Sequence, residues 1–306
     1  MFRYIMERLF ISMVTIFLIA TATFFLLRLL PGNPFQSTTV MTVEMRDQLM
    51  SYYGLDRPVI EQYAKYMTSA LKGDLGYSFK YPGRSVNDVI KRHFPVSAIL
   101  GLQALAVGFP VGLLLGVVAA RNRGKPLDYM CVFVSIIGVS IPSFVLASLL
   151  QYIFGVKLDL LPIAGWGGFM SRVLPTLAMS FGMIAGEARS MRASMLEVSS
   201  EDYMKTAKAK GLSSWQIVWR HQIRNAILPL LTGLGLRAAS LLMGSLIIEQ
   251  IFVIPGLGLY YTNAIQSLDY TMVMGLTIFY GSILVFTNFL VDLSYGLVDP
   301  RIRIAD

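Results

Sequence analysis

The chain has 306 residues, of which 55% are hydrophobic and only 14% are charged. Soluble domains carry about 25% charged residues, so a composition this poor in charge excludes an ordinary soluble protein. The single cysteine, Cys131, excludes a disulfide framework.

Apolar runs long enough to cross a bilayer recur along the chain. A hydrocarbon core of roughly 30 Å needs about 20 mostly apolar residues in a helix. The first run, residues 9–30, is longer than the apolar core of a signal peptide and lacks a small-residue cleavage site, so we expect a retained helix. The sequence predicts an all-α integral membrane protein with about six transmembrane helices. The five later spans are Ala98–Ala120, Tyr129–Val156, Val173–Ala188 (expected to continue as helix beyond the membrane), Ala226–Val253 and Met272–Gly296.

The segment 31–97 separates the first predicted span from the second. It contains several tyrosines, among them Tyr52, Tyr53 and Tyr63, and a helical pattern around Glu61–Leu71. Disordered segments are poor in aromatic residues, so we expect a small folded extracytoplasmic domain. The predicted organisation is a first transmembrane helix 1–30, this segment, a permease core 98–300 that includes a loop 189–225, and a tail 301–306.

The distribution of basic residues predicts the orientation in the membrane. Lys and Arg are frequent in residues 1–8, 121–128, 189–225 and 301–306, whereas residues 254–271 contain none. Because cytoplasmic loops are rich in Lys and Arg, we expect both termini in the cytoplasm. The formal net charge of +8 follows from this bias, so no nucleic-acid partner is needed to explain it.

The loop 189–225 carries signals for two short helices that meet at a corner. Ser199 or Ser200 is expected to cap the first helix, whose early acidic and later basic residues suit the helix dipole. Gly211 then stands where a left-handed helix end needs glycine. Ser213 and Gln216 form a capping-box pattern for the second helix. The loop is either a stiff connection between spans or a docking element for a cytoplasmic partner.

The corner resembles the loop signature of permease subunits in ATP-binding-cassette importers, dipeptide/oligopeptide/nickel branch. The resemblance rests on DYMKTAKAKGL at 202–212 and WRHQIRNAILP at 219–229, together with RLLPGNP at 28–34, IEQIFVIPGLG at 248–258 and DPRIR at 299–303. The acidic residue of the general signature is absent, since Lys205-Thr206-Ala207 stands there. Within the branch, the segment 31–97 is most similar to the first oligopeptide permease subunit.

The resemblance implies an inner-membrane subunit of a prokaryote that works with other chains. They are a second permease, two cytoplasmic ATPase subunits that bind ATP and Mg, and an extracytoplasmic peptide-binding protein. No cofactor is expected in this chain and no enzymatic activity of its own, because its one Gly-Lys pair, Gly124-Lys125, precedes Pro126 and cannot form a P-loop. The residues expected to couple to an ATPase are Glu201, Asp202, Tyr203, Lys205, Thr206, Ala207, Lys208, Ala209, Lys210 and Gly211.

The cargo expected from the resemblance is oligopeptides, with dipeptides, glutathione or nickel as alternatives on the same architecture. A stand-alone secondary transporter is a more distant alternative, because the chain shows no obvious inverted repeat. An integral-membrane enzyme would need a cluster of catalytic side chains near one membrane face, and none is evident.

Ionisable residues within apolar spans are costly and should face protein or water. Glu187 lies near the expected cytoplasmic end of a span, where a gate or a loop anchor is expected. Arg237, Glu249 and Asp292 could bind peptide termini in the pathway, or they could pair with each other or with the sister subunit as structural ties. We favour the structural role, because a pathway for varied peptides should avoid strong fixed charges.

Overall fold

A computed structural model describes residues 2–29, 44, 47–48, 50–51, 54, 56–81 and 83–298, and the side chains of these residues from 5 to 291. Within them the fold is helical, and the one β pairing is an isolated antiparallel bridge between Tyr77 and Ser85. The predictions for residues 31–43, Tyr52, Tyr53 and the tail 301–306 lie outside the described residues. The chain forms two compact units, Met1–Ser97 with Pro255–Asp306, and Ala98–Ile254.

The predicted number of transmembrane helices is confirmed. Five helical segments are long and apolar enough to cross a membrane, and a bent pair of helices makes a sixth if it counts as one span. The fourth predicted span does continue as helix, since α7 runs from Phe169 to Ser200. The other four candidates are Ile5–Leu29, Val86–Arg121, Leu228–Ile251 and Tyr270–Val291.

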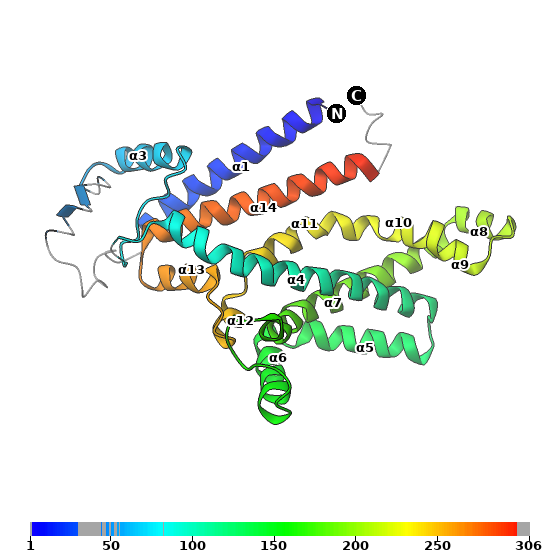
Figure 1. Ribbon diagram of the computed structural model, residues 1–306. Coiled ribbons are helices and arrows are strands. Elements are labelled where there is room, and N and C mark those ends of the chain that lie inside the picture. Colours follow the sequence, from blue (N-terminus) through cyan, green and yellow to red (C-terminus); the bar gives the residue numbers. More distant parts are fainter. Residues whose placement is uncertain are drawn as a thin grey trace. The chain divides into compact units, whose positions relative to one another are not determined.

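In the first unit, α1 (Phe2–Leu29) lies alongside α14 (Tyr270–Val298), as the blue and red helices of Figure 1 show. The helix predicted around Glu61–Leu71 is confirmed as α3 (Val59–Leu71), which contacts α1. The buried ring of Phe24 meets Tyr63 edge-on at 5.4 Å. Helix α13 (Leu257–Gln266) packs on α14. Helix α3 is therefore anchored to α1 through aromatic contacts.

The second unit is arranged around α7. It includes the later part of α4 (Val86–Arg121), and both α5 (Pro126–Ser140) and α6 (Ser143–Leu150) pack on α7. Gly112 and Gly116 allow α4 to approach α7 closely. A Cβ placed at Gly116 would lie 2.6 Å from Cβ of Met191 and 2.7 Å from the carbonyl oxygen of Ala188. Small residues at such spacing are typical of tightly packed membrane helices.

The predicted span Tyr129–Val156 is wrong as a single helix. Its two halves, Pro126–Ser140 and Ser143–Lys157, meet at an angle of 103°. The break falls at Ile141, whose backbone is extended at φ −81° and ψ 121°. Pro142 explains the break, because a proline disfavours helical geometry in the residue before it. The second half ends in the π-helix η1 (Gln151–Lys157), where Gln151 Nε2 donates to the carbonyl of Ile163 at 2.6 Å.

The predicted span Ala226–Val253 is also interrupted. Helix α11 (Leu228–Leu242) ends at a turn in which Gly244 has a φ of +80°, and α12 (Leu246–Ile251) follows. A left-handed residue cannot continue a helix, and glycine takes that conformation without the penalty of a Cβ. The backbone groups freed at this turn have to be satisfied within the protein, as in other broken membrane helices.

Candidate functional site

The predicted first helix of the corner is α8 (Asp202–Ala209), and Figure 1 shows it beside α9 (Ser214–Ile217). The predicted serine cap is wrong. Ser199 and Ser200 still belong to α7, and their hydroxyls donate to the carbonyls of Met195 and Glu197, both at 2.7 Å. The residue at the N-cap position is Glu201, and its side chain makes no capping hydrogen bond.

Gly211 makes the sharp turn after α8. Its φ is +75°, and its amide donates to the carbonyl of Lys208 at 3.0 Å. The predicted capping box of the second helix is confirmed. Gln216 N donates to Ser213 Oγ at 3.3 Å, and Ser213 N donates to Gln216 Oε1 at 3.0 Å. The backbone amides on both sides of the corner are thus hydrogen-bonded.

Helix α8 has one buried and one exposed face. Met204 and Ala207 are buried against Ile217, and Leu212 packs on the same cluster. Of the ten residues predicted to couple to an ATPase, only Ala207 lies on the buried face. The other nine, Glu201, Asp202, Tyr203, Lys205, Thr206, Lys208, Ala209, Lys210 and Gly211, are exposed. Asp202 and Lys205 form an ion pair at 2.8 Å within that exposed face.

The corner is attached to the long helix α7. After α9 the chain continues as the π-helix η2 (Val218–Ile223) and α10 (Arg224–Ala226). Gln222 Nε2 donates to the carbonyl of Met195 at 3.0 Å and also to Ser199 Oγ. Met191 and Met195 of α7 are buried with Val218. The corner is therefore hydrogen-bonded to the end of α7 and packed against it.

A buried ion pair joins the start of α5 to the same helix. Arg192 donates from Nε and Nη2 to the two carboxylate oxygens of Asp128, at 2.6 and 2.8 Å. Asp128 is 2% exposed and also accepts from the amide of Gly124. This bidentate contact is the strong form of an arginine–carboxylate interaction. Neither residue was among the site residues predicted from the sequence.

The polar residues predicted inside the spans occupy different surroundings. Glu187 of α7 is buried and forms an ion pair with Arg237 of α11, whose side chain is 40% exposed. In the structural role that the sequence favoured, Arg237 would pair with Glu249, Asp292 or the sister subunit. Its partner within this chain is instead Glu187. Glu249 is buried in α12. Asp292 lies in α14, and its side chain is outside the described part of the chain.

Another buried carboxylate, Asp269, joins distant segments of the first unit. It lies before the first residue of α14 and accepts hydrogen bonds from the amides of Phe79, Lys80 and Met272 at 3.0, 3.3 and 3.2 Å, and from the hydroxyl of Ser78. It therefore caps α14 and at the same time holds residues 78–80. The signal that could have found it is an aspartate placed directly before an apolar run.

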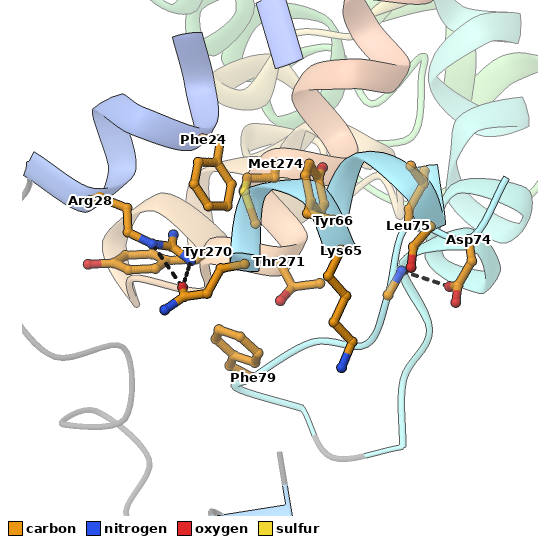
Figure 2. A pocket seen from close by; sticks show the side chains of 13 residues that line it. Phe24, Arg28, Lys65, Tyr66, Asp74, Leu75, Phe79, Tyr270, Thr271 and Met274 are labelled. Atoms are coloured by element: carbon orange, nitrogen blue, oxygen red, sulfur yellow. Dashed lines mark hydrogen bonds between the residues drawn. The ribbon is translucent and has the colours of Figure 1, made fainter. Parts of the chain in front are cut away.

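A cavity of about 130 Å³ opens beside α3 in the same unit (Figure 2). Arg28 lies at its edge, stacks on Phe24 at 4.2 Å and donates from Nε to Gln62 at 3.2 Å. Arg28 Nη1, Tyr66 OH and Thr271 Oγ1 are buried with no hydrogen-bond partner among the described residues. Burial raises the pKa of Tyr66. The space and these polar atoms suit ordered water.

Comparison with known proteins identifies the family. The binding-protein-dependent transport system inner membrane component matches residues 112–304, and the N-terminal part of such membrane components matches residues 1–101. The chain belongs to this family of permeases. The resemblance inferred from residues 202–229 is thereby confirmed.

The permease is similar to full-length relatives of two kinds. It is 46% identical over 304 residues to the dipeptide transport system permease protein DppB of Bacillus subtilis, covering 99% of both chains. It is 41% identical over 305 residues to the oligopeptide transport system permease protein OppB of Haemophilus influenzae, covering 99% of this chain and all of the relative. A solved amino acid ABC transporter with histidines has a TM-score of 0.54 at 17% identity, over 69% of this chain and 94% of that one, which supports the fold alone.

Proposed function

We propose that this chain forms half of the translocation pathway of an ATP-driven peptide importer and that α8 is its contact with an ATPase subunit. Its partners would be a homologous permease, two cytoplasmic ATPase subunits that bind ATP and Mg, and an extracytoplasmic peptide-binding protein. The chain itself would hold no nucleotide. Membership of a binding-protein-dependent transport family supports this assignment.

The observation that carries the proposal is the construction of the corner. A short helix with an exposed, charged face ends at a left-handed glycine and is buried on its other face against α9. Such a helix can fit a groove on a partner and move as one piece with α7. ATP and the loaded binding protein could then shift the transport equilibrium only by favouring the same conformational state.

The orientation belongs to the proposal as well. Both termini and α8 would lie on the cytoplasmic side, where Lys and Arg are most frequent in the loops. Residues 157–172 and 254–271 would then lie outside, together with α3 and the segment around it. This orientation would place the charged face of α8 where ATPase subunits can reach it.

The proposed cargo is peptides, with oligopeptides as the first expectation and dipeptides as the alternative. The names of the relatives include both cargo classes. The chain is 46% identical to the dipeptide permease and 41% identical to the oligopeptide permease, and this difference is too small to decide between the two cargoes. Glutathione and nickel remain alternatives on the same architecture. The ligand carried by the binding protein distinguishes all four.

The first experiment is gentle solubilisation of native membranes and affinity purification of the tagged chain. We expect a second permease, two ATPase chains and a binding protein in the eluate, and a peptide released from that binding protein on denaturation. Nickel or glutathione in place of the peptide would change the assigned cargo, but the assignment as an ATP-driven importer would still hold. Recovery of the chain alone, with solute transport that continues without ATP, would contradict the proposal and favour a secondary transporter.

A cross-linking experiment tests the role of α8 directly. The only native cysteine, Cys131, is buried. A cysteine introduced in place of the exposed Tyr203 would therefore be the thiol that reacts with an added cross-linker. Tyr203→Cys should cross-link to an ATPase chain in intact membranes. Lys157→Cys, exposed at the end of η1, is the matched control and should instead react with a membrane-impermeant maleimide added outside. Cross-linking of both positions to the same ATPase chain would be incompatible with the orientation proposed.

A further inference from the structure

A groove of about 510 Å³ lies in the second unit where α4 ends and η2 begins. Its walls are apolar residues of the last turns of α4, basic residues at and after Arg121, and the tryptophans Trp215 and Trp219. No charged residue occurs between Arg92 and Arg121 in the sequence. Arg121 therefore marks the place where α4 leaves the hydrocarbon region, and the groove lies at the membrane–water boundary.

The aromatic wall has the composition expected at that boundary. Trp215 and Trp219 are 58% and 48% exposed, and their rings meet edge-to-face at 5.4 Å. Tryptophan is enriched at the headgroup level of membranes, because its ring is apolar and its N–H is a hydrogen-bond donor. An exposed tryptophan pair beside a transmembrane helix end is suited to contact with lipid.

The charges of the groove are positive. Arg121 and Lys125 line it and are exposed, and the Arg121 guanidinium lies 5.7 Å from the Trp215 ring. No acidic side chain is among its lining residues. The nearby carboxylate of Asp128 is buried and bound to Arg192. The groove thus presents positive charge that is complementary to a phosphate.

The apolar floor runs from the charged rim along the membrane helix. Leu114 and Val118 line the groove and are 59% and 39% exposed. Both belong to the uncharged stretch of α4, so their exposed surface is continuous with the apolar face of the span. A ligand that fits the whole groove combines an anionic head with an apolar chain.

We propose that this groove binds an anionic phospholipid, with the phosphate between Arg121 and Lys125 and an acyl chain along Leu114 and Val118. A soluble anion would use only the rim, and a protein partner would not require an apolar wall that continues along a membrane span. The inference depends on the membrane placement of α4 and is independent of the cargo and of the ATPase contact.

Tryptophan fluorescence tests the proposal in the full-length protein. The chain has three tryptophans, so Trp166→Phe leaves only the two in the groove. The protein is reconstituted in vesicles of phosphatidylcholine with increasing fractions of brominated phosphatidylglycerol, or of brominated phosphatidylcholine as the neutral quencher. We expect stronger quenching by the anionic lipid than by the neutral one. The binding constant of the anionic lipid relative to the neutral lipid should fall about fivefold in Arg121→Gln and about fivefold in Lys125→Gln, each measured as a single variant. Lys157→Gln is the matched control and should leave it unchanged.

Three outcomes would overturn the proposal. Equal quenching by both lipids, unchanged in the two variants, would mean a non-selective lipid contact. Loss of the preference on addition of glycerol phosphate would mean a site for soluble phosphate. Absence of quenching in the purified chain would mean that lipid does not reach the tryptophans. Both variants change exposed residues, and monodisperse elution with unchanged helical circular dichroism verifies that they are folded.

Discussion

Arg192 of α7 donates two parallel hydrogen bonds to the carboxylate of Asp128, although the two residues are 64 positions apart in the chain. Asp128 lies in the first turn of α5, so the pair fixes where α5 starts relative to α7. The carboxylate is 2% exposed and the arginine side chain 28%. Loss of the arginine would leave an unpaired charge that water reaches poorly.

Arg192→Met should therefore destabilise the protein by about 3 kcal/mol, because breaking a buried pair leaves the other ion uncompensated. The measurement is thermal unfolding of the detergent-solubilised protein, where the apparent melting temperature should fall by several degrees. Arg189→Met is the control, since Arg189 is exposed on the same helix. An equal, small effect of the two variants would mean that the Asp128 contact contributes little.

Gly211→Val should leave the protein in the membrane but uncouple ATP hydrolysis from uptake. The space around Gly211 is open, with no atom within 4 Å of a built Cβ. The cost is therefore conformational: a φ of +75° is unfavourable for L residues and worst for β-branched ones. Gly211→Asn is the matched control, because asparagine tolerates the left-handed region. The measurements are ATPase activity and peptide uptake in the same vesicles, and near-normal uptake by Gly211→Val would refute the role of the corner.

Asp269→Ala should release residues 78–80 from the start of α14. It removes the acceptor for Ser78, Phe79 and Lys80 as well as the cap of the helix, and each lost hydrogen bond to a charged group costs about 1.5–3 kcal/mol. Hydrogen exchange of the amides at residues 78–80 should accelerate. Asp88→Ala, at an exposed position in α4, is the control, and unchanged exchange in Asp269→Ala would show that other contacts hold the segment.

The local features of the fold could be predicted, because their signals lie within a few residues. The capping box at Ser213 and the glycine turn at Gly211 depend only on neighbours in sequence, and both are observed. The serine cap was wrong because α7 continues to Ser200. The span Tyr129–Val156 was predicted as one helix although it contains Pro142, because the two helices form one continuous uncharged stretch in the sequence.

The contacts that assemble each unit could not be predicted in this way. Ser78 and Asp269 are 191 positions apart, and no local pattern indicates that they meet. The same holds for Glu187 and Arg237. The sequence indicated that such charges need partners inside the membrane, but the choice of partner depends on which helix faces pack together. The function was inferred from the family resemblance, whereas these residue pairs were identified only in the structure.

Variants of the ion pair between Glu187 and Arg237 can distinguish a structural role of these residues from a role in binding peptide in the pathway. Glu187 is 1% exposed and Arg237 40%. Arg237→Gln would thus leave a buried carboxylate unpaired, whereas Glu187→Gln would leave the cation of a side chain that is only partly buried. We expect Arg237→Gln to be the more destabilising change, by about 3–5 kcal/mol, measured as thermal unfolding in detergent.

The double variant decides between the two roles. If the pair only ties α7 to α11, Glu187→Gln together with Arg237→Gln should restore most of the stability and also peptide uptake, because two neutral amides need no compensation of charge. If Arg237 binds the carboxylate end of a passing peptide, stability should recover while uptake stays low. We expect recovery of both, since a pathway for varied peptides functions best without a fixed charge that holds one end of each peptide.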